Sequence, residues 1–380
     1  MPVAIPYWRL SGFYFAFFAI LGVLAPYWGP YLRFLGFSAA QIGELIAILH
    51  ATKIIAPNVW GWIADHTGHR MAVVRLASVV ALLLFSGVLV VTDYWPLALL
   101  MAAFSFFWNA ALPQFEANTM NHLGAAHHRY SRIRLWGSVG FIGSVLVVGE
   151  LTDQLGMGIV PSVMMALFAI LTVFSLAAPQ AEQPEAAGEQ PAFLGLLARP
   201  AVIGFFITCF LLQASHGPFY AFYSIHLEDH GYSGGLIGVL WSVGVIAEIG
   251  AFLVMDRLLP LFGPKRLMVV ALALAAVRWT LVAAFVELWW VQLGAQTLHA
   301  ASFGVYHAVG ISLINRFFVG PNQGRGQALY SSLTFGAGVA VGSLAGGYVF
   351  DAAGGASTFY LAAGTAALGA LVAARAIPWR

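Results

Sequence analysis

The stretch "GFSAAQIG" at residues 36–43 occurs again as "GYSGGLIG" at residues 231–238, just past the middle of this 380-residue chain. Both follow the pattern G-(F/Y)-S-x-x-x-I-G. A looser repeat pairs "GELTD" at residues 149–153 with "GYVFD" at residues 347–351, at nearly the same spacing. Chance similarity between glycine-rich turns is the simpler alternative, but two loops that repeat at nearly equal offsets favour a chain built from two equivalent halves.

The composition predicts a membrane protein. Hydrophobic residues make up 61% of the chain and charged residues only 8%, whereas a soluble domain carries roughly 25% charged residues. Long runs without a charge occur at residues 79–91, 94–115, 157–180 and 267–277. A helix that spans a bilayer needs about 20 mostly apolar residues. These runs therefore exclude an ordinary soluble enzyme, and the net charge of +2 gives no reason to expect a nucleic-acid partner.

The apolar runs predict an all-α polytopic membrane protein with twelve transmembrane helices. They are expected near residues 10–31, 41–63, 71–91, 95–121, 134–152, 158–178, 200–224, 235–256, 267–286, 288–311, 326–349 and 356–377. The segment between the sixth and seventh helices is rich in Pro, Glu and Gln and reads as a linker. We therefore expect a six-helix bundle at 1–178, a central loop at 179–199 and a second bundle at 200–380.

Lys and Arg residues predict the orientation, because short cytoplasmic loops are enriched in them. With the N-terminus in the cytoplasm, nearly all of these residues fall on the cytoplasmic side or at that edge, and only Arg33 faces outward. The expected location is the cell inner membrane, with both termini cytoplasmic.

Little in the chain favours a cofactor or a metal. Cys209 is the single cysteine, which excludes a disulfide framework and a thiolate metal site. The phosphate-binding pattern G-x-x-x-x-G-K-(S/T) is absent from the sequence. We expect no cofactor and no metal, and a monomer in the lipid bilayer. Transport is expected either to be driven by an ion gradient or to be facilitated diffusion. Two parallel halves are typical of transporters that bind substrate at mid-membrane.

The loop "GWIADHTGHR" at residues 61–70 resembles the signature loop of the major facilitator superfamily, Gly-x-x-x-Asp-x-x-Gly-x-Arg. Asp65 ends a helix, where its charge can meet an Arg or the N-terminus of a neighbouring helix. The resemblance implies the superfamily fold across the chain. It also implies that Gly61, Asp65, Gly68 and Arg70 form a conformational latch.

"NAALPQFEA" at residues 109–117 and "SRIRLWGSVGF" at residues 131–141 resemble the lactose permease branch of oligosaccharide–proton symporters. That resemblance implies substrate contacts by Glu116, Arg134 and Phe141, where Phe replaces the permease Trp. Over the whole chain the similarity to the phenylpropionate permease family is closer, through "SFFWNA", "LPQFEA" and "HRYSRIRLWGSVGF". Members of that family are associated with uptake of phenylpropionate-type aromatic acids.

The second half carries further matches to the lactose permease branch. Glu248, Arg278 and His299 stand where the permease has its glutamate, arginine and histidine on the corresponding helices. The resemblance implies a proton-coupling group. There is one departure, because Ser302 occupies the position of the permease glutamate that carries the proton.

Charged residues inside the predicted spans indicate a function independently of any family resemblance. A charge near the bilayer centre costs about 2.5–3.5 kcal/mol on insertion scales. Lys53 and Glu248 each lie ten residues after the last Gly of their repeat, so the halves place opposite charges at equivalent depths. We expect Lys53 or Arg134 to receive an anionic group, and Glu248 with Arg278 and His299 to bind the proton. Structural ion pairs are the alternative reading.

The sequence thus predicts a secondary transporter that couples uptake of a small aromatic carboxylate, similar to 3-phenylpropionate, to protons by alternating access. The expected partners are a small-molecule substrate, protons and lipid. Three alternatives are a sugar or nucleoside proton symporter, an efflux carrier for drugs or metabolites, and a membrane enzyme or sensor without transport. The enzyme is disfavoured because no convergent nucleophile and base are evident in the sequence.

Overall fold

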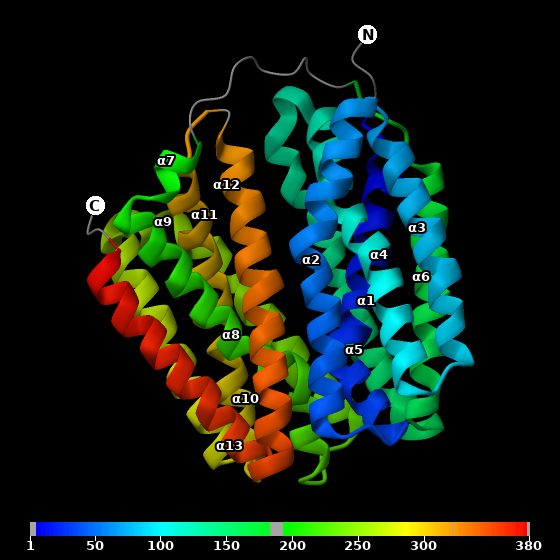
Figure 1. Cartoon of the computed structure of the whole chain (residues 1–380), viewed down its shortest axis with the longest axis vertical. Coiled ribbons are helices and arrows are strands. Elements are labelled where there is room, and N and C mark those ends of the chain that lie inside the picture. The colour runs from blue at the N-terminus through cyan, green and yellow to red at the C-terminus, as the bar shows by residue number, and fades with distance from the viewer. Residues whose placement is uncertain (1–4, 183–192, 321, 378–380) are drawn as a thin grey trace. The chain divides into compact units, whose positions relative to one another are not determined.

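The computed structural model describes residues 5–182, 193–320 and 322–377, and this part of the chain contains helices and no strands. Figure 1 labels the helices in chain order. In the first half they are α1 (Tyr7–Phe34), α2 (Ala39–Thr67), α3 (Arg70–Ser86), α4 (Tyr94–Leu123), α5 (Tyr130–Leu155) and α6 (Val160–Ala177). In the second half they are α7 (Phe193–Leu197), α8 (Pro200–Glu228), α9 (Gly234–Ala284), α10 (Trp289–Thr297), α11 (Tyr306–Phe317), α12 (Asn322–Ser331) and α13 (Val339–Ala376).

Among the described residues, ten helical segments are long and apolar enough to cross a membrane. Two of them, Gly234–Ala284 and Asn322–Ala376, are about twice the length that a bilayer requires. Each is interrupted by a glycine with positive φ, Gly263 at 73° and Gly354 at 80°. A positive φ is not helical, so the chain changes direction at each of these residues. Glycine is suited to this conformation because it has no Cβ. Twelve spans, the number that the sequence predicts, would result if each of these two segments crosses the membrane twice.

The helices form two compact units. Unit 1 comprises Met1–Phe37 and Thr52–Ala186, and unit 2 comprises Ser38–Ala51 and Ala187–Arg380. The first part of α2 thus belongs to unit 2 and the rest of the helix to unit 1. The bundle boundaries at 178 and 200 stay a prediction, and residues 183–192 of the expected loop lie outside the described residues. Part of that loop, Phe193–Leu197, is helical.

The interior of unit 1 is built on α1, which contacts α5 and α6, while α3 contacts α4 and α6. Stacked rings fill the space between helices: Phe13 lies 3.6 Å from Phe115, and Phe17 lies 5.0 Å from Trp108, measured between centroids. Close approach of α1 and α5 depends on Gly140, since a Cβ there would collide with the carbonyl oxygen of Phe15. Small residues permit such contacts between membrane helices.

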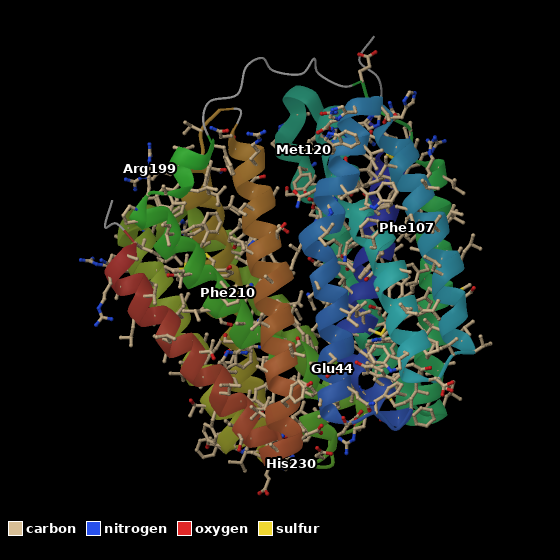
Figure 2. All side chains as sticks on the ribbon, viewed as in Figure 1. Glu44, Phe107, Met120, Arg199, Phe210 and His230 are labelled. Atoms are coloured by element: carbon tan, nitrogen blue, oxygen red, sulfur yellow. The ribbon has the colours of Figure 1, made fainter. Side chains whose placement is uncertain are left out.

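In unit 2, α13 contacts both α8 and α9. Gly342 on α13 faces the backbone of Ala214 on α8, where a Cβ would collide with the carbonyl oxygen. Figure 2 shows Arg199 and His230, which flank α8, at opposite ends of this unit. A long helix with polar residues at its ends and an apolar length between them satisfies its own backbone, as a lipid environment requires.

Two segments depart from the regular helices that the sequence predicts. Ala300–Val305 and Ser332–Gly338 are π-helical, with one wider turn inserted into each run. π-Helical turns are rare and occur often at functional sites. The first of them begins directly after His299, so it shapes the part of unit 2 described next.

Candidate functional site

Arg278 on α9 is fully buried in unit 2. Its Nη2 donates to Oε1 of Gln296 at 2.7 Å. Its Nη1 lies 2.9 Å from Nδ1 of His299 and donates to Oγ of Ser302 at 3.2 Å. A guanidinium has no acceptor, so Nδ1 of His299 accepts in this arrangement. The buried cation is therefore held by neutral partners on the neighbouring helical segment.

Glu248 continues this contact on the other side of the imidazole ring. Nε2 of His299 lies 3.5 Å from Oε2 of Glu248. Because Nδ1 faces Arg278, a neutral His299 carries its proton on Nε2, directed to the carboxylate. The three residues that the sequence predicts for proton coupling thus form one chain, Arg278–His299–Glu248, within unit 2. We call this chain the Arg–His–Glu relay.

Aromatic faces complete the surroundings of Arg278. Its Cζ lies 4.4 Å from the ring centroid of Phe219 and 4.3 Å from that of Trp279. A guanidinium over an aromatic face is attracted by the ring quadrupole, most strongly when both are desolvated. The rings and the hydrogen bonds together fix the guanidinium plane, so the cation has a defined direction toward His299.

The charged residues of unit 1 are arranged differently. Tyr130 donates from its hydroxyl to Oε1 of Glu116 at 3.2 Å. The Cζ atom of Arg134 lies 3.6 Å from the ring centroid of Phe18 and 5.8 Å from that of Tyr14. Glu116 and Arg134 are half-buried. This group, which we call the Glu116–Arg134 site, combines one carboxylate and one cation with aromatic rings.

The two other residues predicted to contact substrate also lie in unit 1. Phe141 is half-buried on α5, and its carbonyl oxygen accepts from Oγ of Ser144 at 3.0 Å. Lys53 is half-buried on α2. Its ammonium group makes no hydrogen bond or ion pair within the described residues. The side chain of the preceding residue, Thr52, is hydrogen-bonded, since its Oγ1 accepts from Nδ2 of Asn109 at 2.9 Å.

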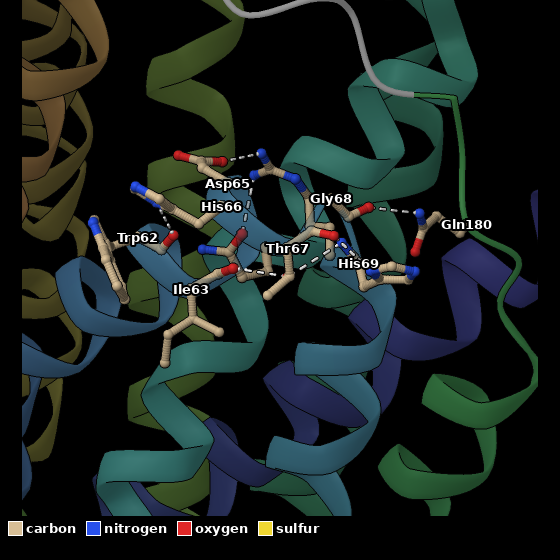
Figure 3. A network of polar contacts seen from close by, with 10 residues as sticks. Trp62, Ile63, Asp65, His66, Thr67, Gly68, His69 and Gln180 are labelled. Atoms are coloured by element: carbon tan, nitrogen blue, oxygen red, sulfur yellow. Dashed lines mark hydrogen bonds and ion pairs between the residues drawn. The ribbon is translucent and has the colours of Figure 1, made fainter.

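Figure 3 shows the polar contacts of the signature loop, all of them in unit 1. Nη2 of Arg70 pairs with Oδ1 of Asp65 at 2.6 Å, and Nη1 donates to Oε1 of Gln114 on α4 at 3.0 Å. Gly68 has φ +68° and turns the chain from α2 to α3. Its carbonyl oxygen accepts from Nε2 of Gln180 at 3.0 Å. Arg70 therefore links three helices at this end of the unit.

Gly61 belongs to the same group of contacts, because a Cβ at this position would lie 3.4 Å from Nε2 of Gln114. The two members of the ion pair differ in exposure: the side chain of Asp65 is 64% exposed and that of Arg70 only 18%. An exposed carboxylate can change partner at little cost, whereas Arg70 is anchored. The four predicted latch residues lie together, and their role in switching stays a proposal.

The sequence did not reveal several partners of these charged residues. Three of these partners are neutral polar residues: Gln296, Gln114 and Tyr130. Such residues are common in membrane helices, so nothing in the sequence marks them as partners of a charged group. The same holds for Phe18, which resembles many other aromatic residues of the chain. In the sequence Ser302 stands out only as a departure from the permease pattern, yet its hydroxyl accepts a hydrogen bond from Arg278.

Residues 7–361 match the MFS_1-like family. The chain belongs to this family. The probable 3-phenylpropionic acid transporter of Escherichia coli (strain K12) is 27% identical over 363 residues, which cover 90% of this chain and 91% of the relative. The maltose permease of Geobacillus stearothermophilus is 28% identical over 349 residues, covering 89% and 86%.

The fold agrees with this family membership. The chain is similar to the crystal structure of the nucleoside transporter NupG, with a TM-score of 0.82, 21% identity, and coverage of 96% of this chain and 97% of that one. At this identity the likeness concerns the fold. The MFS_1-like protein is a multi-pass membrane protein with the major facilitator fold, a transporter of small molecules rather than an enzyme.

Proposed function

We propose that this transporter takes up a small aromatic carboxylate together with protons, by alternating access across the cell inner membrane. The observation that carries the proposal is the Arg–His–Glu relay. It places a carboxylate, an imidazole and a fully buried guanidinium in sequence within membrane-spanning helices. Ionisable residues at such depth are expensive and mark proton or substrate pathways.

The relay can bind and release a proton without a glutamate at position 302. A proton on Glu248 removes one negative charge from the group, and its release restores that charge. A guanidinium close to a carboxylate favours its ionised form, whereas an apolar environment favours its protonated form. A change in the distance between Arg278 and Glu248 would therefore change proton affinity. His299 lies between the two and transmits this change.

The substrate assignment rests on unit 1 and on the relatives. Arg134 supplies a cation for a carboxylate beside the ring of Phe18, and we expect Lys53 and Phe141 to contribute a second cation and a second apolar face. Guanidinium and aromatic faces together suit a ligand with one charged end and one ring. A relative named as a probable 3-phenylpropionic acid transporter matches nine-tenths of the chain, which supports the same class.

Transport in liposomes tests this proposal. We expect labelled 3-phenylpropionate to accumulate above its equilibrium level when the outside is more acidic than the inside, and a protonophore to abolish the accumulation. Uptake should rise as the external pH falls, because protons move inward with the substrate. Equal uptake with and without the pH gradient would contradict proton coupling.

Sugar or nucleoside symport is the second candidate, since a maltose permease is among the relatives and a nucleoside transporter shares the fold. Competition separates the two candidates. Unlabelled benzoate and cinnamate should displace labelled 3-phenylpropionate, whereas maltose and uridine should not. The reverse order of displacement would favour the second candidate. Vesicles of opposite orientation would distinguish uptake from efflux.

Three further features belong to the proposal: cytoplasmic termini, an inner-membrane location and a monomeric state. The distribution of Lys and Arg supports the orientation. Labelling of a cysteine placed at Ser38, between α1 and α2, by an impermeant reagent on intact cells tests it, because this loop should be external.

A further inference from the structure

The start of α2 is capped from a distant part of the chain. Oδ1 of Asp351 accepts from the backbone N–H of Ala39 at 2.8 Å, and Oδ2 accepts from that of Ala40, also at 2.8 Å. Asp351 lies on α13, while Ser38–Ala51 and α13 both belong to unit 2. One carboxylate thus binds two backbone donors of a helix more than 300 positions away in the sequence.

The remaining donors of this helix end are satisfied locally. Ser38 and Gln41 form a reciprocal box: the N–H of Gln41 donates to Oγ of Ser38 at 3.3 Å, and the N–H of Ser38 donates to Oε1 of Gln41 at 3.0 Å. A helix begins with four N–H groups that lack a partner within the helix. Here two have a partner on their own segment, and two depend on Asp351.

Below the cap, α2 and α13 touch through their backbones. A Cβ at Gly43 would lie 3.0 Å from Cα of Gly347, and one at Gly347 would lie 3.1 Å from Cα of Gly43. Beside these glycines, the hydroxyl of Tyr348 donates to Oε1 of Glu44 at 2.6 Å, and Figure 2 labels Glu44 near this end of α2. We call this set, with the Asp351 cap, the α2–α13 contact.

The elements of the contact recur in the internal repeat. Ser38 and Ser233 both follow the first aromatic residue of the repeated turn, and Oγ of Ser233 accepts from the N–H of Leu236 at 3.3 Å. Asp153 occupies the position in "GELTD" that Asp351 occupies in "GYVFD". An acidic residue at this position is thus a feature of both halves.

We propose that Asp351 is a releasable cap that holds the start of α2 against α13 in one state of the transport cycle and releases it in the other. A carboxylate at a helix N-terminus is favoured by the N–H groups and by the helix dipole. Asp351 is exposed, so water can replace the two amides when α2 departs. The local box of Ser38 and Gln41 then keeps the helix end intact. The inference requires alternating access but no particular substrate.

A reporter cysteine at Ala40 tests the proposal, since its side chain is half-buried in the contact and its backbone amide is retained. The native Cys209 is fully buried, and the parent chain supplies the background. The measurement is the rate of labelling by an impermeant maleimide on intact cells without substrate, after a protonophore has dissipated the proton gradient. Its outcome is therefore independent of the outcome of the transport assays.

Asp351→Asn in the reporter chain should speed labelling by about tenfold, because the amide keeps one acceptor oxygen, turns an NH2 group toward the second backbone N–H and removes the negative charge. Gly347→Ala should speed it likewise, because the added methyl would lie against the carbonyl oxygen of Ala39. Asp93→Asn is the matched control: Asp93 precedes α4 at the N-cap position but makes no side-chain cap hydrogen bond.

Labelling of Asp351→Asn at the rate of the Asp93→Asn control would overturn the proposal. If Asp351→Asn is not recovered as a folded protein, Gly347→Ala decides, since it keeps the carboxylate and disturbs only the close approach. A parent-like rate in Gly347→Ala would also contradict a contact that opens and closes at this site.

Discussion

The Glu116–Arg134 site of unit 1 and the Arg–His–Glu relay of unit 2 contain the same types of charge in different arrangements. In unit 1, Arg134 lies over the ring of Phe18 and a tyrosine hydroxyl holds the carboxylate. In unit 2, Arg278 is fully buried and hydrogen-bonded to the imidazole that faces the carboxylate. The half-buried site suits a ligand that enters and leaves, and the connected one suits a proton.

The two halves of the chain repeat the same turn, but they do not repeat the contacts of their charged residues. Each half places a charge at the same distance after its repeated turn, Lys53 in one and Glu248 in the other. Only Glu248 is joined to a buried cation through a third residue. We therefore expect substitutions in the relay to affect coupling and substitutions in the Glu116–Arg134 site to affect affinity.

The largest effect is expected for Arg278→Lys. An ammonium cannot reproduce the forked donors that reach Gln296, His299 and Ser302, nor the planar contact with the rings. Accumulation driven by a pH gradient should fall by about a hundredfold or more, and its pH dependence should flatten. Arg257→Lys, an exposed position on the same helix, is the matched control. Retention of gradient-driven uptake in Arg278→Lys would contradict the assignment of proton coupling to the Arg–His–Glu relay.

Arg134→Gln should have the next largest effect, mainly on KM. Loss of the cation beside Phe18 removes the attraction for a carboxylate, and KM for 3-phenylpropionate should rise about tenfold with the pH dependence unchanged. Initial uptake rates across substrate concentrations measure this. Arg132→Gln, an exposed neighbour two residues earlier, should behave like the parent. A change in pH dependence without a change in KM would assign Arg134 to coupling instead.

Ser302→Ala should have the smallest effect. It removes one neutral acceptor of Arg278 at 3.2 Å and leaves the bonds to His299 and Gln296. Loss of one such hydrogen bond should slow coupled uptake by about fivefold. Ser331→Ala, a half-buried position on α12, controls for a lost hydroxyl in the same unit. Complete loss of coupling would mean that Ser302 itself belongs to the proton path.

Much of the fold follows from the sequence, because apolar runs of bilayer length leave few alternatives. The helix bounds differ from the predictions by a few residues, as for α1 at Tyr7–Phe34 against 10–31. The π-helical turns at Ala300–Val305 and Ser332–Gly338 were not predicted, since their residues do not differ in type from those of ordinary helices.

The candidate site was predictable only where it carries charge. Glu248, Arg278 and His299 are conspicuous because buried ionisable groups are costly in a membrane, and the structure brings these three together. Gln296 was not predicted, although it accepts the shortest hydrogen bond that Arg278 donates. The cap on α2 was not predicted either, because Asp351 and Ala39 are too far apart in the sequence for any local pattern to join them.

The most direct test of the central claim is Glu248→Gln, assayed both for exchange and for accumulation in the same liposomes. The account predicts that labelled substrate still exchanges with unlabelled substrate across the membrane, while accumulation driven by the pH gradient is lost. Glu287→Gln, an exposed carboxylate in unit 2, should retain both activities. Accumulation by Glu248→Gln at the level of this control would contradict a relay that couples protons to transport.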